Sequence, residues 1–246
     1  MFSSKRGRAI TTGITAIVIG GGSFGIVACS SSSSSSSSTA ASSSSTAASS
    51  SPSDPGGFQS GVAKGAKPRS GPAAGGSIGT VSSVSGSSFM LSTSGGYKET
   101  IKETSSTTYD KGTSQASASA VTTGETVLVL GTTDNTTITA TQVMVPPPTS
   151  TEKSPGGKVQ VFTKGSKHST QQAGTIPSNY TEGKGTIVDA TTADKAVVAA
   201  LGVYTGGVVD RVVSIGDGYY EVHNIGVEWP HHIFENSDFQ VIGAND

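Results

Sequence analysis

A long low-complexity stretch limits how much of this chain can fold. Residues 30–75 consist mostly of serine, alanine, glycine and proline, and residues 30–38 are an unbroken run of serine. Such a composition lacks the apolar side chains whose burial offsets the entropy of an ordered chain. Regular apolar patterning occurs only in residues 78–145 and 185–243. We therefore expect two small folded regions, 76–147 and 185–246, joined by a linker at 148–184 and preceded by a disordered tether at 29–75.

Charge and cysteine content exclude several classes of function. The chain has 16 Lys and Arg against 17 Asp and Glu, a formal net charge of −1. Neither sign is in excess, so a nucleic acid is not the expected partner. The one cysteine excludes an intramolecular disulfide and a cysteine-rich metal site.

The amino terminus has the layout of an export signal. Basic residues lie within positions 5–8, and residues 9–28 are uncharged and largely apolar. The segment ends in Ile26-Val27-Ala28-Cys29, which resembles the lipobox of bacterial lipoproteins. The resemblance implies cleavage of a 1–28 signal peptide between Ala28 and Cys29, and a covalent diacylglycerol on the Cys29 sulfur. It also implies a protein anchored by lipid on the extracytoplasmic face of the cell membrane.

Two other interpretations of this terminus remain open. Residues 9–28 are barely long enough for an uncleaved membrane anchor, and their glycines and threonines suit that role poorly. Alternatively, Cys29 is an incidental residue next to an ordinary cleavage site, and the protein is secreted. In the lipoprotein interpretation, a flexible tether of about 45 residues spans roughly 35–40 Å and lifts the folded regions above the lipid headgroups. A glycosylated stalk would serve the same role.

The first folded region is predicted to be all-β. Residues 78–145 alternate apolar and polar side chains, with turns at Ser85-Gly86-Ser87, Ser94-Gly95-Gly96 and Asp134-Asn135. Prolines at 146–148 end the last strand. Five or six short strands with close turns predict a small antiparallel barrel. The segments GTVSSVSGSSFMLST, TTGETVLVLGT and TITATQVMV resemble a bacterial extracytoplasmic family of small β-barrels of unknown function, which implies an OB-like fold and no chemistry.

The second folded region is predicted to be α+β. Val197, Ala200, Leu201 and Tyr204 follow the spacing of one apolar helix face, and Thr191 with Asp194 suggests the helix start. Strands are predicted at 208–215, 219–227 and 239–242, the first two joined by Gly216-Asp217-Gly218.

This second region resembles the PepSY-like domains of secreted bacterial proteins. The resemblance is carried by AALGVYTGGVVDRVVSIGDGYYEVHNIGV and a closing DFQV. It implies a non-catalytic module found in the cell envelope and associated with peptidase inhibition. Three departures stand out: Thr205 replaces a turn proline, Gly202 lies inside the helix at a cost of up to about 1 kcal/mol relative to alanine, and HNIGVEWPHHIF replaces a polar hairpin.

Histidines gather near this last departure. His223, His231 and His232 could ligate a metal together with Glu221, Glu228 or Glu235, although the spacing matches no known ligand pattern. If the chain is extended around His231-His232, their rings point to opposite faces and at most one joins His223. The segment Trp229, His231 and His232 is otherwise a recognition surface or plain packing, because tryptophan is a typical contact anchor.

Catalytic motifs are present only as accidental matches. Gly-rich matches at 20–25 and 75–79 lack the strand–turn–helix context that their chemistry needs. We therefore expect no enzyme and no cofactor beyond the Cys29 lipid. The sequence favours a surface-tethered binding module whose partner is another envelope protein or a peptidase. The alternative is a lipoprotein that binds a metal or small ligand through His223, Trp229, His231 and His232.

Overall fold

The computed structural model describes residues 72–165 and 167–246. The predicted signal peptide, the predicted lipidation site Cys29 and nearly all of the predicted tether lie outside these residues. The described residues fall within one compact unit of the chain. They contain no helix that is both long and apolar enough to cross a membrane.

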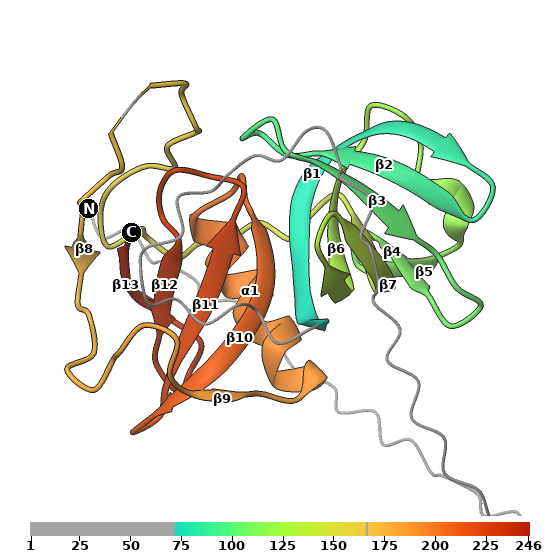
Figure 1. The fold of residues 1–246 in the computed structure, drawn as a ribbon. Coiled ribbons are helices and arrows are strands. Elements are labelled where there is room, and N and C mark those ends of the chain that lie inside the picture. Colours follow the sequence, from blue (N-terminus) through green and yellow to red (C-terminus); the bar gives the residue numbers. More distant parts are fainter. Residues whose placement is uncertain (1–71, 166) are drawn as a thin grey trace, which may run out of the picture. The chain divides into compact units, whose positions relative to one another are not determined.

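Five strands close into a barrel, drawn in cyan to yellow-green in Figure 1. Each strand pairs with the next around the ring in the order β1-β2-β3-β7-β6, and β6 pairs back with β1. The predicted turns connect the hairpins: Gly86 and Asn135 adopt positive φ angles of 58° and 51° between β1 and β2 and between β6 and β7. The bounds are β1 Ala73–Ser85, β2 Ser88–Ser92, β3 Lys98–Lys102, β6 Thr126–Asp134 and β7 Thr137–Val145.

The barrel is mixed, and the prediction of an antiparallel barrel was wrong on this point. Strands β3 and β7 run parallel where the ring closes, and β4 (Thr108–Lys111) also pairs with β7 in parallel. Between β3 and β7 the chain passes through β4, β5 (Ser114–Ala116), a short 3-10 helix (Ala118–Ala120) and β6. Local turns predict antiparallel neighbours, but this closing pair is formed by strands far apart in sequence.

The barrel interior is filled mainly by aliphatic and aromatic side chains that alternate along the strands. Val127 and Val129 on β6, for example, point inward while Thr126 is exposed. The buried cluster consists of Val81, Phe89, Leu91, Ile101, Tyr109, Val121, Val127, Val129, Ile138, Ala140, Val143 and Val145.

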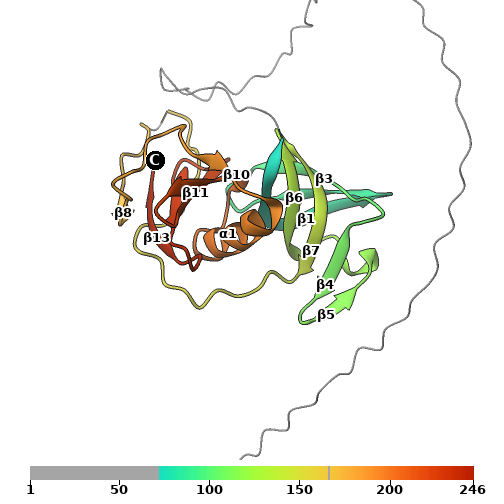
Figure 2. The same ribbon diagram turned by 90° about the horizontal axis from the view of Figure 1, so that it is seen from below.

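A helix packed on an antiparallel sheet forms the remainder, here called the helix–sheet region. Strands β10, β11, β12 and β13 pair in sequence order, and Figure 2 shows α1 lying against them. Two-residue strands extend the edges, with β9 (Thr186–Ile187) on β10 and β8 (Ala173–Gly174) on β13. The bounds are α1 Ala190–Val203, β10 Val208–Gly216, β11 Tyr219–Ile225, β12 His232–Glu235 and β13 Val241–Asn245.

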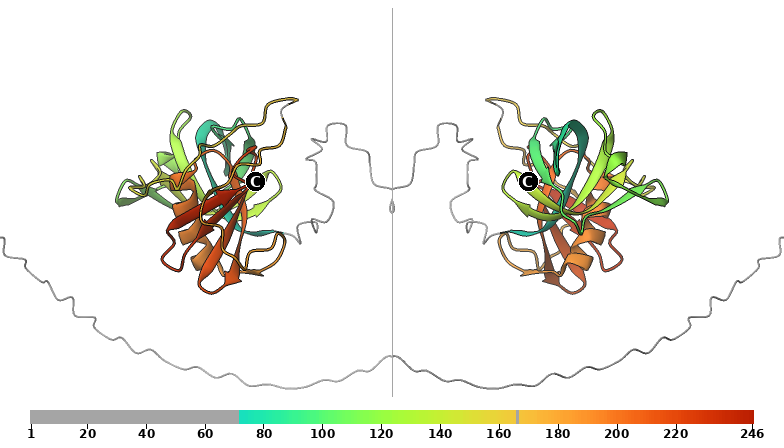
Figure 3. Two further views of the ribbon diagram at one scale, coloured as in Figure 1. Left: turned by 90° about the vertical axis from the view of Figure 1, so that its left-hand side faces the viewer. Right: turned by 90° about the vertical axis from the view of Figure 1, so that its right-hand side faces the viewer.

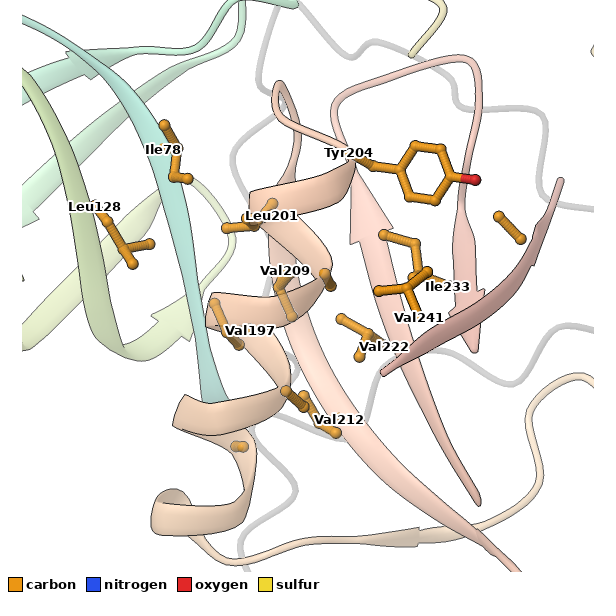
Figure 4. Packing of buried hydrophobic residues seen from close by; sticks show 14 of the residues in the cluster. Ile78, Leu128, Val197, Leu201, Tyr204, Val209, Val212, Val222, Ile233 and Val241 are labelled. Carbon is orange, nitrogen blue, oxygen red and sulfur yellow. The ribbon is translucent and has the colours of Figure 1, made fainter. Parts of the chain in front are cut away.

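The N-cap of helix α1 lies two residues before the predicted cap Thr191. The side chain of Asp189, not Thr191, accepts a hydrogen bond from the Thr192 backbone N–H at 3.0 Å. The predicted apolar face is confirmed, since Val197, Leu201 and Tyr204 are buried against Val209, Val222 and Ile233 of the sheet (Figure 4).

Strand β1 belongs to both parts of the fold. Gly76 and Ser77 pair with Val209 and Val208 of β10, while the same strand pairs with β2 and β6 in the barrel. Ile78 and Leu128 also pack into the helix–sheet core (Figure 4). Figure 3 shows the orange and red strands from one side and the green barrel strands from the other. The barrel and the helix–sheet region therefore share a sheet and a core.

Candidate functional site

Titratable side chains gather on the face of the β10–β11–β12 sheet that lies away from α1. Val222 and Ile233 point toward the helix, so their strand neighbours His223 and His232 point to the opposite face. His223 and His232 are direct cross-strand partners, and their ring centroids are 5.3 Å apart. The pairing of β11 with β12 (His232–Glu235), a strand that was not predicted, thus brings two of the three candidate histidines together.

Each of these two histidines is hydrogen-bonded to a different buried carboxylate. The Nδ1–H of His223 donates to Oδ1 of Asp210 at 2.7 Å, and the Nδ1–H of His232 donates to Oε1 of Glu221 at 2.8 Å. The Asp210 and Glu221 side chains are only 4% and 1% exposed. Such a pair fixes the orientation of the ring and leaves Nε2 as the nitrogen that can meet another group.

Tyr180 covers this pair from the segment before α1. Its ring lies 5.6 Å from that of His232 and makes an edge-on contact with Phe234 at 4.6 Å. Burial raises the pKa of the Tyr180 hydroxyl well above its usual value, and the charges of Glu221 and Glu182 act in the same direction. Together, Asp210, Tyr180, Glu221, His223 and His232 form what we call the histidine cluster.

His231 lies apart from the histidine cluster. Its Nε2–H donates to the Val227 carbonyl at 2.7 Å, and its ring is 6.2 Å from Phe162. Burial lowers the pKa of this imidazole. The alternation of an extended strand separates it from His232, as the sequence predicted for adjacent residues.

Of the three candidate acidic ligands, Glu221 belongs to the histidine cluster and the other two lie elsewhere. Glu228 accepts a hydrogen bond from the Ser169 N–H at 3.2 Å, and Glu235 is fully buried near Glu152 and Ala200 of α1. Burial raises the pKa of Glu235 well above its usual value, and the charge of Glu152 adds to this effect. Within residues 72–165 and 167–246, no group of three or more His, Cys, Asp or Glu side chains is arranged to hold a metal ion.

Trp229 is a core residue in this fold. Its ring is 0% exposed, contacts Tyr204 edge-on at 5.4 Å, and donates its Nε1–H to the Gln171 carbonyl at 2.8 Å. The segment around Gly157 passes directly over the ring. Trp229 was interpreted either as part of a recognition surface or as a packing residue. Packing describes its position, because no part of the ring reaches the surface.

The exposed apolar residues nearest to Trp229 lie on that covering segment. Val161 and Phe162 are adjacent in sequence and are 47% and 52% exposed. They follow Gln160, whose backbone pairs with that of Trp229. This pair presents an apolar surface within the predicted linker, at residues 158–162 where a short extra strand was also considered.

A shallow cavity of about 300 Å³ lies at the other side of the helix–sheet region. It is lined by Pro148 to Glu152 and by Lys195, Val198 and Ala199 of α1. The Oε1 atom of Glu152 is already occupied, since it accepts the Val241 N–H at 2.6 Å. The cavity therefore has a carboxylate and an ammonium group beside an aliphatic wall, and the ammonium of Lys195 also lies 5.6 Å from the centre of the Phe239 ring.

Sequence reasoning missed two members of the histidine cluster. Asp210 is placed by an irregularity in the pairing of β10 with β11, which falls between Val209 and Arg211. Tyr180 lies in the stretch predicted as linker. Neither residue carries a local motif, because long-range strand pairing and the path of the covering segment bring both to the site.

Comparisons with protein-family models, with curated proteins and with solved structures found no match to this chain.

Proposed function

We propose that this chain is a non-enzymatic cell-envelope lipoprotein that acts as a surface-tethered binding or regulatory module. The observation that carries this proposal is the Ile26-Val27-Ala28-Cys29 junction behind a basic and an apolar segment. The first described strand begins at Ala73, where the low-complexity segment ends. A lipid on Cys29 would then be joined to the folded part by a long serine-rich tether.

The topology supports the domain types inferred from sequence. The strand order β1-β2-β3-β7-β6 with a parallel closing pair agrees with an OB-like barrel, and a helix on four antiparallel strands agrees with a PepSY-like domain. By analogy with PepSY-like domains, the partner is a peptidase or another envelope protein. Fold analogy indicates the class of partner and no individual one.

The exposed Val161 and Phe162 pair is the surface best suited to a protein partner. Adjacent apolar side chains on an otherwise polar segment are typical of contact sites. If a secreted peptidase is inhibited by the protein, Phe162→Ala should weaken the inhibition. Val84→Ala is the matched control, because Val84 is also exposed, at 46%, but lies on the barrel.

The lipid anchor is tested by intact mass and membrane partition of the mature protein beside a Cys29→Ala variant. We expect a wild-type chain that starts at Cys29, carries a lipid-sized mass increment and partitions with membranes, and a variant that loses the increment. If both chains keep Met1 and stay embedded, residues 9–28 are an anchor. If both are cleaved and soluble, the cysteine is incidental. Either of these results would reject the lipoprotein proposal.

The alternative function is binding of a metal or small ligand, and the His223–His232 pair favours it. The two rings are adjacent, and each is oriented by a carboxylate. Of the residues first considered for this role, His231 is bonded elsewhere and Trp229 is in the core. Titration with Zn²⁺ or Cu²⁺ should show stoichiometric uptake that His223→Gln or His232→Gln abolishes and His231→Gln preserves. Absence of uptake would remove this alternative.

A further inference from the structure

A carboxyl group without a charged partner is buried where the barrel meets the helix–sheet region. Glu99 lies on β3 directly opposite Leu91 of β2, and its strand neighbour Ile101 points into the barrel core. By the alternation of a strand, the Glu99 side chain points into the barrel as well. It is 0% exposed, and both of its carboxyl oxygens lack a hydrogen-bond partner among the described residues.

The polar neighbour of Glu99 already makes a hydrogen bond between the barrel and the helix–sheet region. Ser77 of β1 lies beside the carboxyl group, but its hydroxyl donates to the Gly207 carbonyl at 3.1 Å. Ser77 also pairs with Val208 of β10. The environment of Glu99 is therefore held by contacts between β1 and the start of β10.

The turn that leads into β3 is docked on the same part of the helix–sheet region. A Cβ atom at Gly95 would lie 2.8 Å from the Gly206 carbonyl oxygen and 3.1 Å from that of Gly226. The Tyr97 ring packs against Gly226, and the Ser94 hydroxyl donates to the Thr205 carbonyl at 3.4 Å. Glu99 follows this turn by two residues, so hydration of its carboxyl group would disturb the docked turn.

No charge nearby compensates an ionised Glu99. Burial raises the pKa of its carboxyl from 4.5 to about 8, the Ser77 hydroxyl acts in the opposite direction, and no charged group contributes. The charged residues of the surrounding elements face elsewhere: Lys98, Lys102 and Asp134 are exposed, and Asp210 is paired with His223. A buried carboxylate in this position must either stay protonated or admit water.

We propose that Glu99 is a proton-dependent latch between the barrel and the helix–sheet region. As a neutral acid, it stays buried and the β2–β3 turn remains docked on the segments around Gly206 and Gly226. As a carboxylate, it draws water into the barrel mouth and the turn separates from those segments. The latch does not depend on the proposed lipid anchor.

The direction of the pH effect follows from the different pKa of the Glu99 carboxyl in the open and closed states. In the open state the carboxyl is hydrated and ionises near its ordinary pKa of 4.5, whereas in the closed state it ionises near 8. Between these values the closed state holds one proton more than the open state, so a rise in pH favours opening. The ratio of open to closed molecules then increases up to about tenfold per pH unit and levels off above pH 8.

Hydrogen exchange of the full-length chain tests this proposal. The amides of Thr93, Gly96 and Tyr97 make hydrogen bonds within the β2–β3 turn, and separation of the turn from Gly206 and Gly226 removes the packing that protects these bonds from solvent. Their protection factors, corrected for intrinsic exchange, should fall by up to about tenfold per pH unit from pH 5 to 8. The amides of Thr107 and Gly112, which are bonded elsewhere in the barrel region, should keep constant protection.

Glu99→Gln should make the protection of the three turn amides independent of pH. Glu125→Gln, the same chemical change at a half-buried barrel position, should leave the wild-type response intact. A pH response that persists in Glu99→Gln, or is absent from the wild type, would overturn the proposal. If Glu99→Gln does not fold, ¹³C NMR titration of the wild-type carboxyl replaces it. An apparent pKa raised above the ordinary 4.5 together with co-titration of the Tyr97 amide supports the latch, and a value near 4.5 refutes it.

Discussion

At the scale of single residues, Trp229 joins three parts of the helix–sheet region. Its ring contacts Tyr204 at the end of α1, its indole N–H is bonded to the Gln171 carbonyl, and Gly157 passes over it. The stretch between β7 and β8 has little regular structure of its own. Trp229 is therefore the main apolar support that holds this stretch against the sheet.

We predict that Trp229→Ala lowers the free energy of unfolding by about 3–5 kcal/mol, because it leaves a large cavity under the covering segment. Trp229→Phe should cost less, since it loses the bond to Gln171 but keeps most of the apolar contact. Urea unfolding followed by circular dichroism measures both effects. Phe162→Ala, at an exposed position, is the control and should be nearly neutral. A Trp229→Ala variant as stable as that control would show that the ring is not a core support.

At the scale of elements, the presence of a glycine inside α1 is explained by a neighbouring segment outside the helix. A Cβ atom at Gly202 would lie 2.9 Å from the Cβ atom of Ser150, in the segment that crosses the helix after β7. The sequence marks Gly202 as a weak point in an apolar helix. The structure shows that the absence of a side chain lets the chain pass close to α1.

Gly202→Ala should therefore not deliver the stabilisation of about 1 kcal/mol that helix propensity alone predicts. The contact with Ser150 should cancel or reverse the gain. Combining it with Ser150→Gly should recover the gain, so the two substitutions are expected to be non-additive in a double-mutant cycle measured by urea unfolding. A gain of the full propensity value in Gly202→Ala alone would contradict the close approach.

Elements defined by local patterns could be predicted from the sequence, and those defined by distant partners could not. The hairpin turns and the apolar face of α1 follow from neighbouring residues. Strand β12 was missed because all four of its residues, His232–Glu235, are buried, which leaves no alternation to detect. The parallel β3–β7 pair, the position of Asp210 and the cover provided by Tyr180 depend on long-range contacts. Three of the five members of the histidine cluster, Glu221, His223 and His232, could therefore be named from the sequence.

At the scale of the whole described fold, β1 makes the barrel and the helix–sheet region interdependent. The strand supplies one wall of the barrel and an edge partner for β10, and Ile78 enters the core around α1. The Thr133 hydroxyl of β6 also donates to the Val209 carbonyl at 3.2 Å. We expect the two parts to unfold together.

This predicts that a cavity in the barrel destabilises the environment of Trp229. Ile138→Ala on β7 removes a fully buried barrel side chain and should cost about 2–5 kcal/mol. The loss should appear in the unfolding midpoint followed by Trp229 fluorescence, as well as in circular dichroism, with coincident transitions. Trp229 fluorescence that keeps its wild-type midpoint in Ile138→Ala would show two independently folding domains.

The long first strand also governs the order in which the fold can be completed. Ser77 bonds to Gly207, a residue 130 positions further along the chain. During synthesis, β1 emerges early but lacks one of its three partner strands until β10 has been made. Contacts of such high sequence separation slow folding, because a large loop must close before they form. The edge of β1 that receives β10 is therefore open for most of translation, and we expect chains truncated before β10 to aggregate through it.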